Sequence, residues 1–291
     1  MKEENLKVSQ KALIQACKNL GVKYSLIHRD KILVKVELDP PLFFLHHYKA
    51  FNREDLVRIS NDKDLQYSLL ADRINIPDWK SYLDPNCNPK FRHIAEFNSI
   101  KKIADDISEN FNFPIVVKRN KGSQGNHVFL CKDLQYIRKS LRKIFDTRSK
   151  HYDYIAIAQD FITIKSEYRV IGYKGNVLLN YEKDNKDADY QGNLSPLHWK
   201  GAKARLISDE SLNKRIQDFI KPVFQVLPIN FSGFDIAVDS DDKFWLIEIN
   251  NSPGLSYFEK DNGVNEIVKM YEFILQDLIN DQNERRSEEN C

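Results

Sequence analysis

The sequence has few cysteines and no surplus of charge of either sign, and each absence excludes a class of protein. Its four cysteines, Cys17, Cys87, Cys131 and Cys291, show neither the C-x-x-C spacing of a zinc or redox site nor the density of a disulfide scaffold. The 44 Lys and Arg residues nearly balance the 42 Asp and Glu residues, so the formal charge of +2 gives no general attraction to nucleic acid or membranes. Any basic binding site must therefore be local.

Long apolar segments are missing as well. No stretch approaches the roughly 18 apolar residues that span a bilayer, and the start Met1-Lys-Glu-Glu-Asn-Leu lacks the apolar centre of a signal peptide. We therefore expect a soluble, cytoplasmic protein with no nucleic-acid or membrane partner. At 291 residues the chain is long enough for two or three compact modules.

Hydrophobic spacing predicts an α+β fold in which helices and strands alternate along the chain. We expect helices near residues 9–20, 65–74, 100–107, 134–144, 216–224 and 266–279, with the fifth interrupted or bent at Pro222. We expect strands near 24–27, 32–36, 114–118, 128–130, 154–158, 168–172, 177–181, 233–238 and 244–249. The predicted organisation is a small module over 1–60, two α+β subdomains over 61–155 and 156–280, and a polar tail over 281–291.

Three oxygen-bearing side chains form the strongest candidate site. Asp235 and Glu248 lie on two predicted strands joined by a turn, and Asn250 is two residues beyond Glu248 on the same strand face. Carboxylate and amide oxygens are the ligands of hard cations such as Mg²⁺, which usually completes its shell with substrate phosphates. The alternative is a solvated sheet face, although the apolar neighbours of these residues favour a buried site.

A glycine loop is the second candidate. Lys118 ends a predicted strand, and Gly122-Ser123-Gln124-Gly125 follows shortly after it. Glycine lets backbone N–H groups approach a phosphate closely, and lysine supplies a point charge. No G-K-[ST] sequence follows, so this is not a Walker motif, and a hairpin turn with surface lysines explains the stretch equally well.

The third candidate is Gln159-Asp160-Phe161-Ile162, followed by Glu167 and Arg169. Backbone groups of a linker strand can recognise adenine, and a nearby carboxylate can accept ribose hydroxyl hydrogen bonds. An ordinary strand with exposed Glu and Arg would have the same sequence.

In this order the segments resemble the ATP-grasp superfamily, in particular its branch that is cyanophycin-synthetase-like and ribosomal-protein-glutamate-ligase-like. The resemblance covers about residues 60–260, from Asn61-Asp62-Lys63 to Glu248-Ile-Asn-Asn-Ser-Pro-Gly254. It implies two α+β subdomains that grip ATP at their interface. It also implies that Lys63 and Lys118 contact phosphates, that residues 122–125 cover the terminal phosphates, and that residues 159–162 form the hinge facing adenine.

The resemblance further assigns Glu167 to the ribose, Arg169 to phosphate or acyl-phosphate charge, and Asp235, Glu248 and Asn250 to Mg²⁺, with Mn²⁺ as a possible substitute. Where relatives have Asn-Leu followed closely by an Arg-Gly-Gly-like turn, this chain has Asn193-Leu194 and then, at a longer spacing, Lys200-Gly201. Lys200 is expected to stand in for the arginine, without its bidentate fork. Alternatively, His198 and Trp199 belong to a substrate pocket or form a structural pair.

The implied reaction is ATP-dependent ligation of a carboxylate to an amine through an acyl phosphate, releasing ADP and phosphate. The substrates would be an amino acid, a peptide or a protein side chain. Lysines, an arginine and Mg²⁺ are what such a step needs, because phosphoryl transfer depends on positioning and on charge neutralisation. An ATP-grasp kinase acting on an alcohol and a non-catalytic Mg-ATP-binding module remain alternatives. The sequence does not indicate an oligomeric state.

Overall fold

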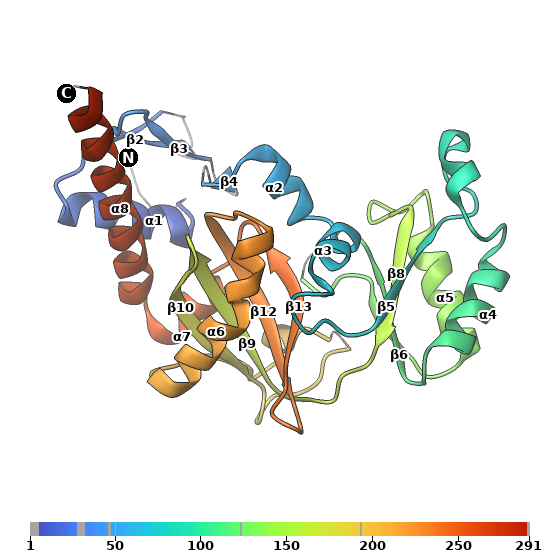
Figure 1. Cartoon of the computed structure of the whole chain (residues 1–291). Coiled ribbons are helices and arrows are strands. Elements are labelled where there is room, and N and C mark those ends of the chain that lie inside the picture. The colour runs from blue at the N-terminus through green and yellow to red at the C-terminus, as the bar shows by residue number, and fades with distance from the viewer. Residues whose placement is uncertain are drawn as a thin grey trace.

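The computed structural model describes residues 6–27, 33–45, 48–49, 51–122, 124–192 and 194–289. The described residues form three antiparallel sheets (Figure 1). The first sheet has the order β1-β2-β3-β4 and consists of β1 (Tyr24–Leu26), β2 (Leu33–Val36), β3 (Leu42–Leu45) and β4 (Tyr48–Lys49). It belongs to the N-terminal part of the chain, which begins with α1 (Val8–Asn19).

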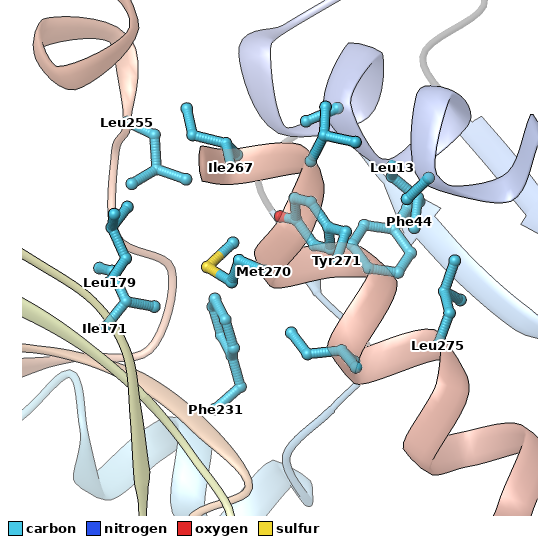
Figure 2. Packing of buried hydrophobic residues seen from close by; sticks show 14 of the residues in the cluster. Leu13, Phe44, Ile171, Leu179, Phe231, Leu255, Ile267, Met270, Tyr271 and Leu275 are labelled. Carbon is cyan, nitrogen blue, oxygen red and sulfur yellow. The ribbon is translucent and has the colours of Figure 1, made fainter. Parts of the chain in front are cut away.

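The N-terminal module packs against the last helix of the chain. Helix α1 lies beside α8 (Asn265–Glu289), as Figure 1 shows. In Figure 2, Tyr271 of α8 lies among Leu13 and Phe44 of the N-terminal module, and the rings of Phe44 and Tyr271 meet edge to face with centroids 5.9 Å apart. This shared core, which also contains Phe231 and Met270, joins the module to the C-terminal half.

The predicted polar tail is wrong for residues 281–289, because α8 continues to Glu289. Lys174 contacts Asp277 and Asp281 at 2.6 and 2.7 Å, and Arg286 contacts Asp39 at 3.1 Å. The polar composition of this segment therefore belongs to a helix whose charged side chains bind neighbouring elements, an arrangement that composition alone does not separate from a tail.

The second sheet has the order β5-β8-β6-β7, formed by β5 (Trp79–Leu83), β8 (Ile155–Asp160), β6 (Ile115–Arg119) and β7 (Val128–Cys131). Helices α4 (Ile100–Asn110) and α5 (Leu134–Ile144) contact each other beside this sheet and bury their apolar stripes in one core with it (Figure 1). A 3₁₀ turn, η2, covers Pro89–Ile94. Strand β8 spans the border expected between residues 155 and 156, and the domain limits otherwise stay predictions.

The third sheet has five strands in the order β11-β10-β9-β12-β13. Its strands are β11 (Lys203–Leu206), β10 (Asn176–Asp184), β9 (Ile164–Tyr173), β12 (Phe231–Asp239) and β13 (Phe244–Asn250). Helix α6 (Glu210–Val226) packs against it and continues through Pro222, so the proline does not interrupt the helix. The β9–β10 turn is Lys174-Gly175, both with positive φ. The short elements η3 (Pro196–His198) and α7 (Ser256–Asn262) complete this half.

Two short helices connect the sheets. Helices α2 (Glu54–Ile59) and α3 (Lys63–Leu70) follow the N-terminal module, and the Asp62 side chain caps α3 by accepting from the Leu65 N–H. From α3, Gln66 exchanges hydrogen bonds with the backbone of Ile249 on β13. Helix α3 is thereby fixed to the edge of the third sheet. Among the described residues, no helix is both long enough and apolar enough to cross a membrane.

Candidate active site

A cavity of about 700 Å³ brings together residues of the second and third sheets with residues of the N-terminal module. Most of its charged lining comes from the third sheet and from β6. Polar and charged lining residues from these strands, from β8 and from α3 include Lys63, Lys118, Gln159, Glu167, Arg169, Lys183, Asp235, Glu248 and Asn250. The cavity is the main candidate for a functional site.

Strand register places three of these side chains in one row. Asp235 on β12 lies opposite Arg169 on β9 and opposite Glu248 on β13. The register between β12 and β13 then shifts, so that Ile236 pairs with Leu246 and Ile247 is the extra residue of a bulge. The predicted convergence of Asp235 and Glu248 on one site is therefore present in the structure.

Asp235 is the centre of a buried ion-pair network. Arg169 holds both carboxylate oxygens in a bidentate contact, with Nη2 to Oδ2 at 2.9 Å, and Lys183 Nζ lies 2.9 Å from Oδ1. Lys183 also pairs with Glu167. Because each charge has an opposite neighbour, the network tolerates burial that would be costly for any one of these groups alone.

The network sets the charge states of its members. Burial alone would raise the pKa of Asp235, but Arg169 and Lys183 hold it far below its usual range. Burial alone would lower the pKa of Arg169 and of Lys183, yet the Asp235 carboxylate raises both, and Glu167 adds to the rise for Lys183. Burial raises the pKa of Glu167, which Lys183 opposes. Asp235, Arg169 and Lys183 are therefore charged at neutral pH.

Glu248 and Asn250 form the second polar group on β13. The Asn250 amide nitrogen donates to Glu248 Oε1 at 2.9 Å, and Lys63 Nζ lies 3.1 Å from Glu248 Oε2. This orientation leaves the Asn250 amide oxygen for another contact. No group of three His, Cys, Asp or Glu side chains in the described ranges is placed to hold a metal ion. The candidate ligand set therefore consists of two carboxylates and one amide.

The two lysines expected to bind phosphate lie close to each other in the cavity. Lys63 Nζ donates to the carbonyl of Gly122 at 3.0 Å, which links α3 to the glycine loop. Lys118 is buried, and its Nζ donates to the Tyr67 hydroxyl at 2.8 Å. Burial, with Lys63 as a smaller cause, lowers the pKa of Lys118 to about 7, whereas Glu248 acts in the opposite direction. Lys118 thus lacks a carboxylate partner close enough to offset its burial.

The structure brings together most of the predicted residues. Gln124 and Gly125 line the cavity, and so do Gln159, Phe161 and Ile162 at the junction of β8 and β9. Gly122 and Asp160 are not among the described lining residues, although Gly122 binds Lys63 and Asp160 ends β8. Ser123 lies outside the described residues.

Lys200 does not join this group. Its side chain is exposed, and its backbone forms an isolated antiparallel β-bridge with Asp189. Lys200 is not among the described residues that line the cavity. His198 does line the cavity, whereas Trp199 lines a neighbouring cavity of about 620 Å³ and packs edge to face on Tyr190. The role of Lys200 stays a prediction from the sequence, and the structure gives it no support.

Sequence reasoning missed Lys183, which lines the cavity, and Tyr67, which contacts Lys118. Lys183 follows Leu179 and Tyr181 with period two on β10, so strand alternation alone would have placed it on the buried face. Tyr67 lies on the buried side of α3, where its hydroxyl accepts from Lys118 and donates to the Ile247 carbonyl at 2.6 Å. The sequence carries no comparable signal for that contact.

Comparisons with known proteins agree with this arrangement. The RimK-like ATP-grasp domain family matches residues 79–274. An uncharacterized protein of Mycoplasma genitalium is 27% identical over 207 residues, which are 70% of this chain and 65% of that protein. A probable alpha-L-glutamate ligase of an Enterobacter species is 26% identical over 162 residues, 55% of this chain and 50% of the relative. The chain thus spans between half and two thirds of the length of these relatives.

Among solved structures, the D-alanine–D-alanine ligase from Bacillus anthracis complexed with ATP is similar at a TM-score of 0.51 and 18% identity. The similarity covers 80% of this chain and 69% of that protein. At this identity the likeness concerns the fold.

Proposed function

Because this chain belongs to the RimK-like ATP-grasp family, which matches residues 79–274, we propose that it is an ATP-dependent carboxylate–amine ligase. The reaction would begin with attack of a substrate carboxylate on the γ-phosphoryl group of ATP, giving an acyl phosphate and ADP. An amine would then attack the acyl carbon and release phosphate. The name of the probable alpha-L-glutamate ligase supports an amino acid or a peptide as the substrate.

The observation that carries this proposal is the gathering of Lys63, Lys118, Arg169 and Lys183 in the lining of one cavity. Transfer of a phosphoryl group to a carboxylate brings two anions together, and preorganised cations are the main means by which proteins stabilise that arrangement. Arg169 and Lys183 are held in place by Asp235, so they need no reorganisation when the charge develops. The described residues of the cavity offer no other grouping of comparable charge.

Nucleotide binding is assigned to the end of the cavity formed by the second sheet. Lys118 and the loop residues Gln124 and Gly125 would contact phosphates, with Ser123 included on sequence grounds. Residues 159–162 would face adenine, and the buried Glu167 carboxylate would accept hydrogen bonds from the ribose. Lys118 is available to bind a phosphate because its ammonium group has no carboxylate close enough to offset its burial.

A divalent cation fits the group formed by Asp235, Glu248 and Asn250. All three offer hard oxygen atoms, and the Asn250 amide is oriented so that its oxygen is left for another contact. When bound, Mg²⁺ would neutralise phosphate charge and polarise the transferring group. Arg169 and Lys183 would continue to hold Asp235 in its ionised form, and Lys63 would orient Glu248.

The direct test is turnover of Mg-ATP with pooled L-amino acids and short peptides, with measurement of ADP, AMP and product mass. We expect ADP together with a product whose mass equals the two substrates minus water. Glu248→Ala should abolish both, whereas Glu284→Gln, an exposed change on α8, should abolish neither. A phosphorylated alcohol as product, or AMP in place of ADP, would contradict the proposed ligation.

A further inference from the structure

The cavity extends beyond the charged network to a second end of different character. This end is lined by Lys7, Val8 and Ser9 at the start of α1, by residues 252–257 around the start of α7, and by Leu194, Ser195, Leu197 and His198 before and within η3. Among these described lining residues there is no carboxylate. The second end is therefore chemically distinct from the part assigned to the nucleotide and metal.

His198 and Tyr257 form a defined pair at this end. The Nδ1 atom of His198 lies 3.0 Å from the Tyr257 hydroxyl, and the two rings meet edge to face with centroids 5.6 Å apart. One side chain comes from η3 and the other from α7, so the contact fixes the orientation of an imidazole that is only half-buried. His198 Nδ1 is occupied by Tyr257, which leaves Nε2 to contact a ligand.

The surroundings of His198 favour its neutral form. Burial is the largest cause that lowers its pKa, followed by the positive charges of Lys183 on β10 and Arg169 on β9. Tyr257 on α7 adds a neutral partner instead of the carboxylate that would stabilise an imidazolium ion. At neutral pH the ring is therefore able to accept a proton.

We propose that this end of the cavity is the subsite for the incoming amine and that His198 Nε2 accepts the proton which the ammonium form must lose before it attacks. This inference rests on the proposed ligation. In the proposed arrangement, the Nδ1–H group of His198 donates to the Tyr257 hydroxyl oxygen, and that contact holds the tautomer with the lone pair on Nε2.

The proton balance of the step is complete without a further reactant. R′NH₃⁺ gives one proton to Nε2, and the resulting amine forms a C–N bond to the acyl carbon. The C–O bond to phosphate breaks with its electron pair on the phosphate, which takes the second nitrogen proton and leaves as HPO₄²⁻. His198 then releases its proton to solvent. Arg169 and Lys183 lower the pKa of His198, so they favour the release of this proton to solvent after the transfer.

The two half-reactions can be separated with hydroxylamine, which is already unprotonated at neutral pH and traps an acyl phosphate as a hydroxamate. With Mg-ATP and the standard L-amino acids as probes, the wild-type protein should form both hydroxamate and amide product. His198→Gln should reduce amide formation by about 100-fold or more, a range typical of lost acid–base catalysis, and keep hydroxamate formation within about 3-fold. The exposed His93 supplies the control, since His93→Gln should change neither product.

Other outcomes overturn the inference. Equal loss of hydroxamate and amide in His198→Gln would mean that the residue supports the first half-reaction or the fold, and unchanged amide formation would mean that it accepts no proton. If the wild-type protein forms no hydroxamate at all, the proposed ligation itself fails and this inference falls with it. The amide-forming rate of the wild type should rise with pH on an acidic limb that His198→Gln lacks.

A second measurement needs no substrate. In ¹⁵N-labelled protein, the His198 ring, assigned by its absence in His198→Gln, should be neutral at pH 7 with the proton on Nδ1. Tyr257→Phe removes the acceptor for that proton and should shift the tautomer toward Nε2–H while lowering amide formation. A wild-type ring that is protonated, or that carries its proton on Nε2, would overturn the assignment.

Discussion

Replacing Lys118 with methionine should stabilise the protein and remove its response to ATP. In the structure, Lys118 is buried beside Lys63, and its Nζ donates to the Tyr67 hydroxyl. Its pKa is lowered from 10.5 to about 7, chiefly by burial, with Lys63 contributing and Glu248 opposing. At about 1.36 kcal/mol per pKa unit, this shift corresponds to a penalty on the order of 4 kcal/mol in the free energy of unfolding near pH 7.

The sign of the pH dependence follows from the two protonation states. Between about pH 7 and pH 10 the unfolded chain holds a proton on Lys118 that the folded chain lacks, so the contribution of this residue to the free energy of unfolding rises with pH. Below pH 7 both states are protonated and the penalty is complete. The advantage of Lys118→Met should therefore be about 4 kcal/mol near pH 7 and fall to about 2 kcal/mol near pH 9.

The assay is urea denaturation at both pH values, with and without Mg-ATP. Tyr67 keeps its hydrogen bond to the Ile247 carbonyl in the variant, so little is lost when Lys118 is removed. Mg-ATP should raise the unfolding midpoint of the wild type and not that of Lys118→Met, and the exposed Lys132→Met should match the wild type within about 0.5 kcal/mol. A variant that is less stable than the wild type would refute the burial argument, and an unchanged response to Mg-ATP would refute the phosphate role.

Two further predictions concern the frame of the site. Asp235→Asn should lower the free energy of unfolding by about 3–5 kcal/mol in urea denaturation, because it leaves the buried Arg169 and Lys183 without their shared carboxylate. The exposed Asp218→Asn is the control and should change the free energy of unfolding little. Equal stability of the two variants would contradict the ion-pair network around Asp235. Gly233→Ala should lower the free energy of unfolding by about 1–3 kcal/mol and reduce turnover, because the added Cβ would lie 2.6 Å from the Cβ of Pro253 in the turn after β13. Gly254→Ala, in the same turn but with nothing within 4 Å of the added atom, is the matched control for stability, and equal effects of the two changes on the free energy of unfolding would refute the steric argument.

Local patterns in the sequence determined the elements that carry the site. Asp62 caps α3 because its side chain precedes an amphipathic run, and the two apolar strands joined by a short polar turn place Asp235 opposite Glu248. Glycines 122 and 125 mark a loop, and the apolar periodicity of α4 and α5 predicts both helices. These features depend on residues close together in the chain, which is why they can be read from one sequence.

The tertiary structure decided which charged side chains meet. Lys183 and Arg169 reach Asp235, and Glu167 reaches Lys183, only because β10, β9 and β12 lie side by side, and no local pattern states that order. For the same reason the cavity takes in His198 and leaves Lys200 exposed, although they are two residues apart. The polar segment after Asp281 continues α8, which contacts α1 and forms ion pairs through Asp281 with Lys174 and through Arg286 with Asp39. Spacing along the chain predicts which face a side chain lies on, but the free energy of a buried charge depends on neighbours that only the folded chain supplies.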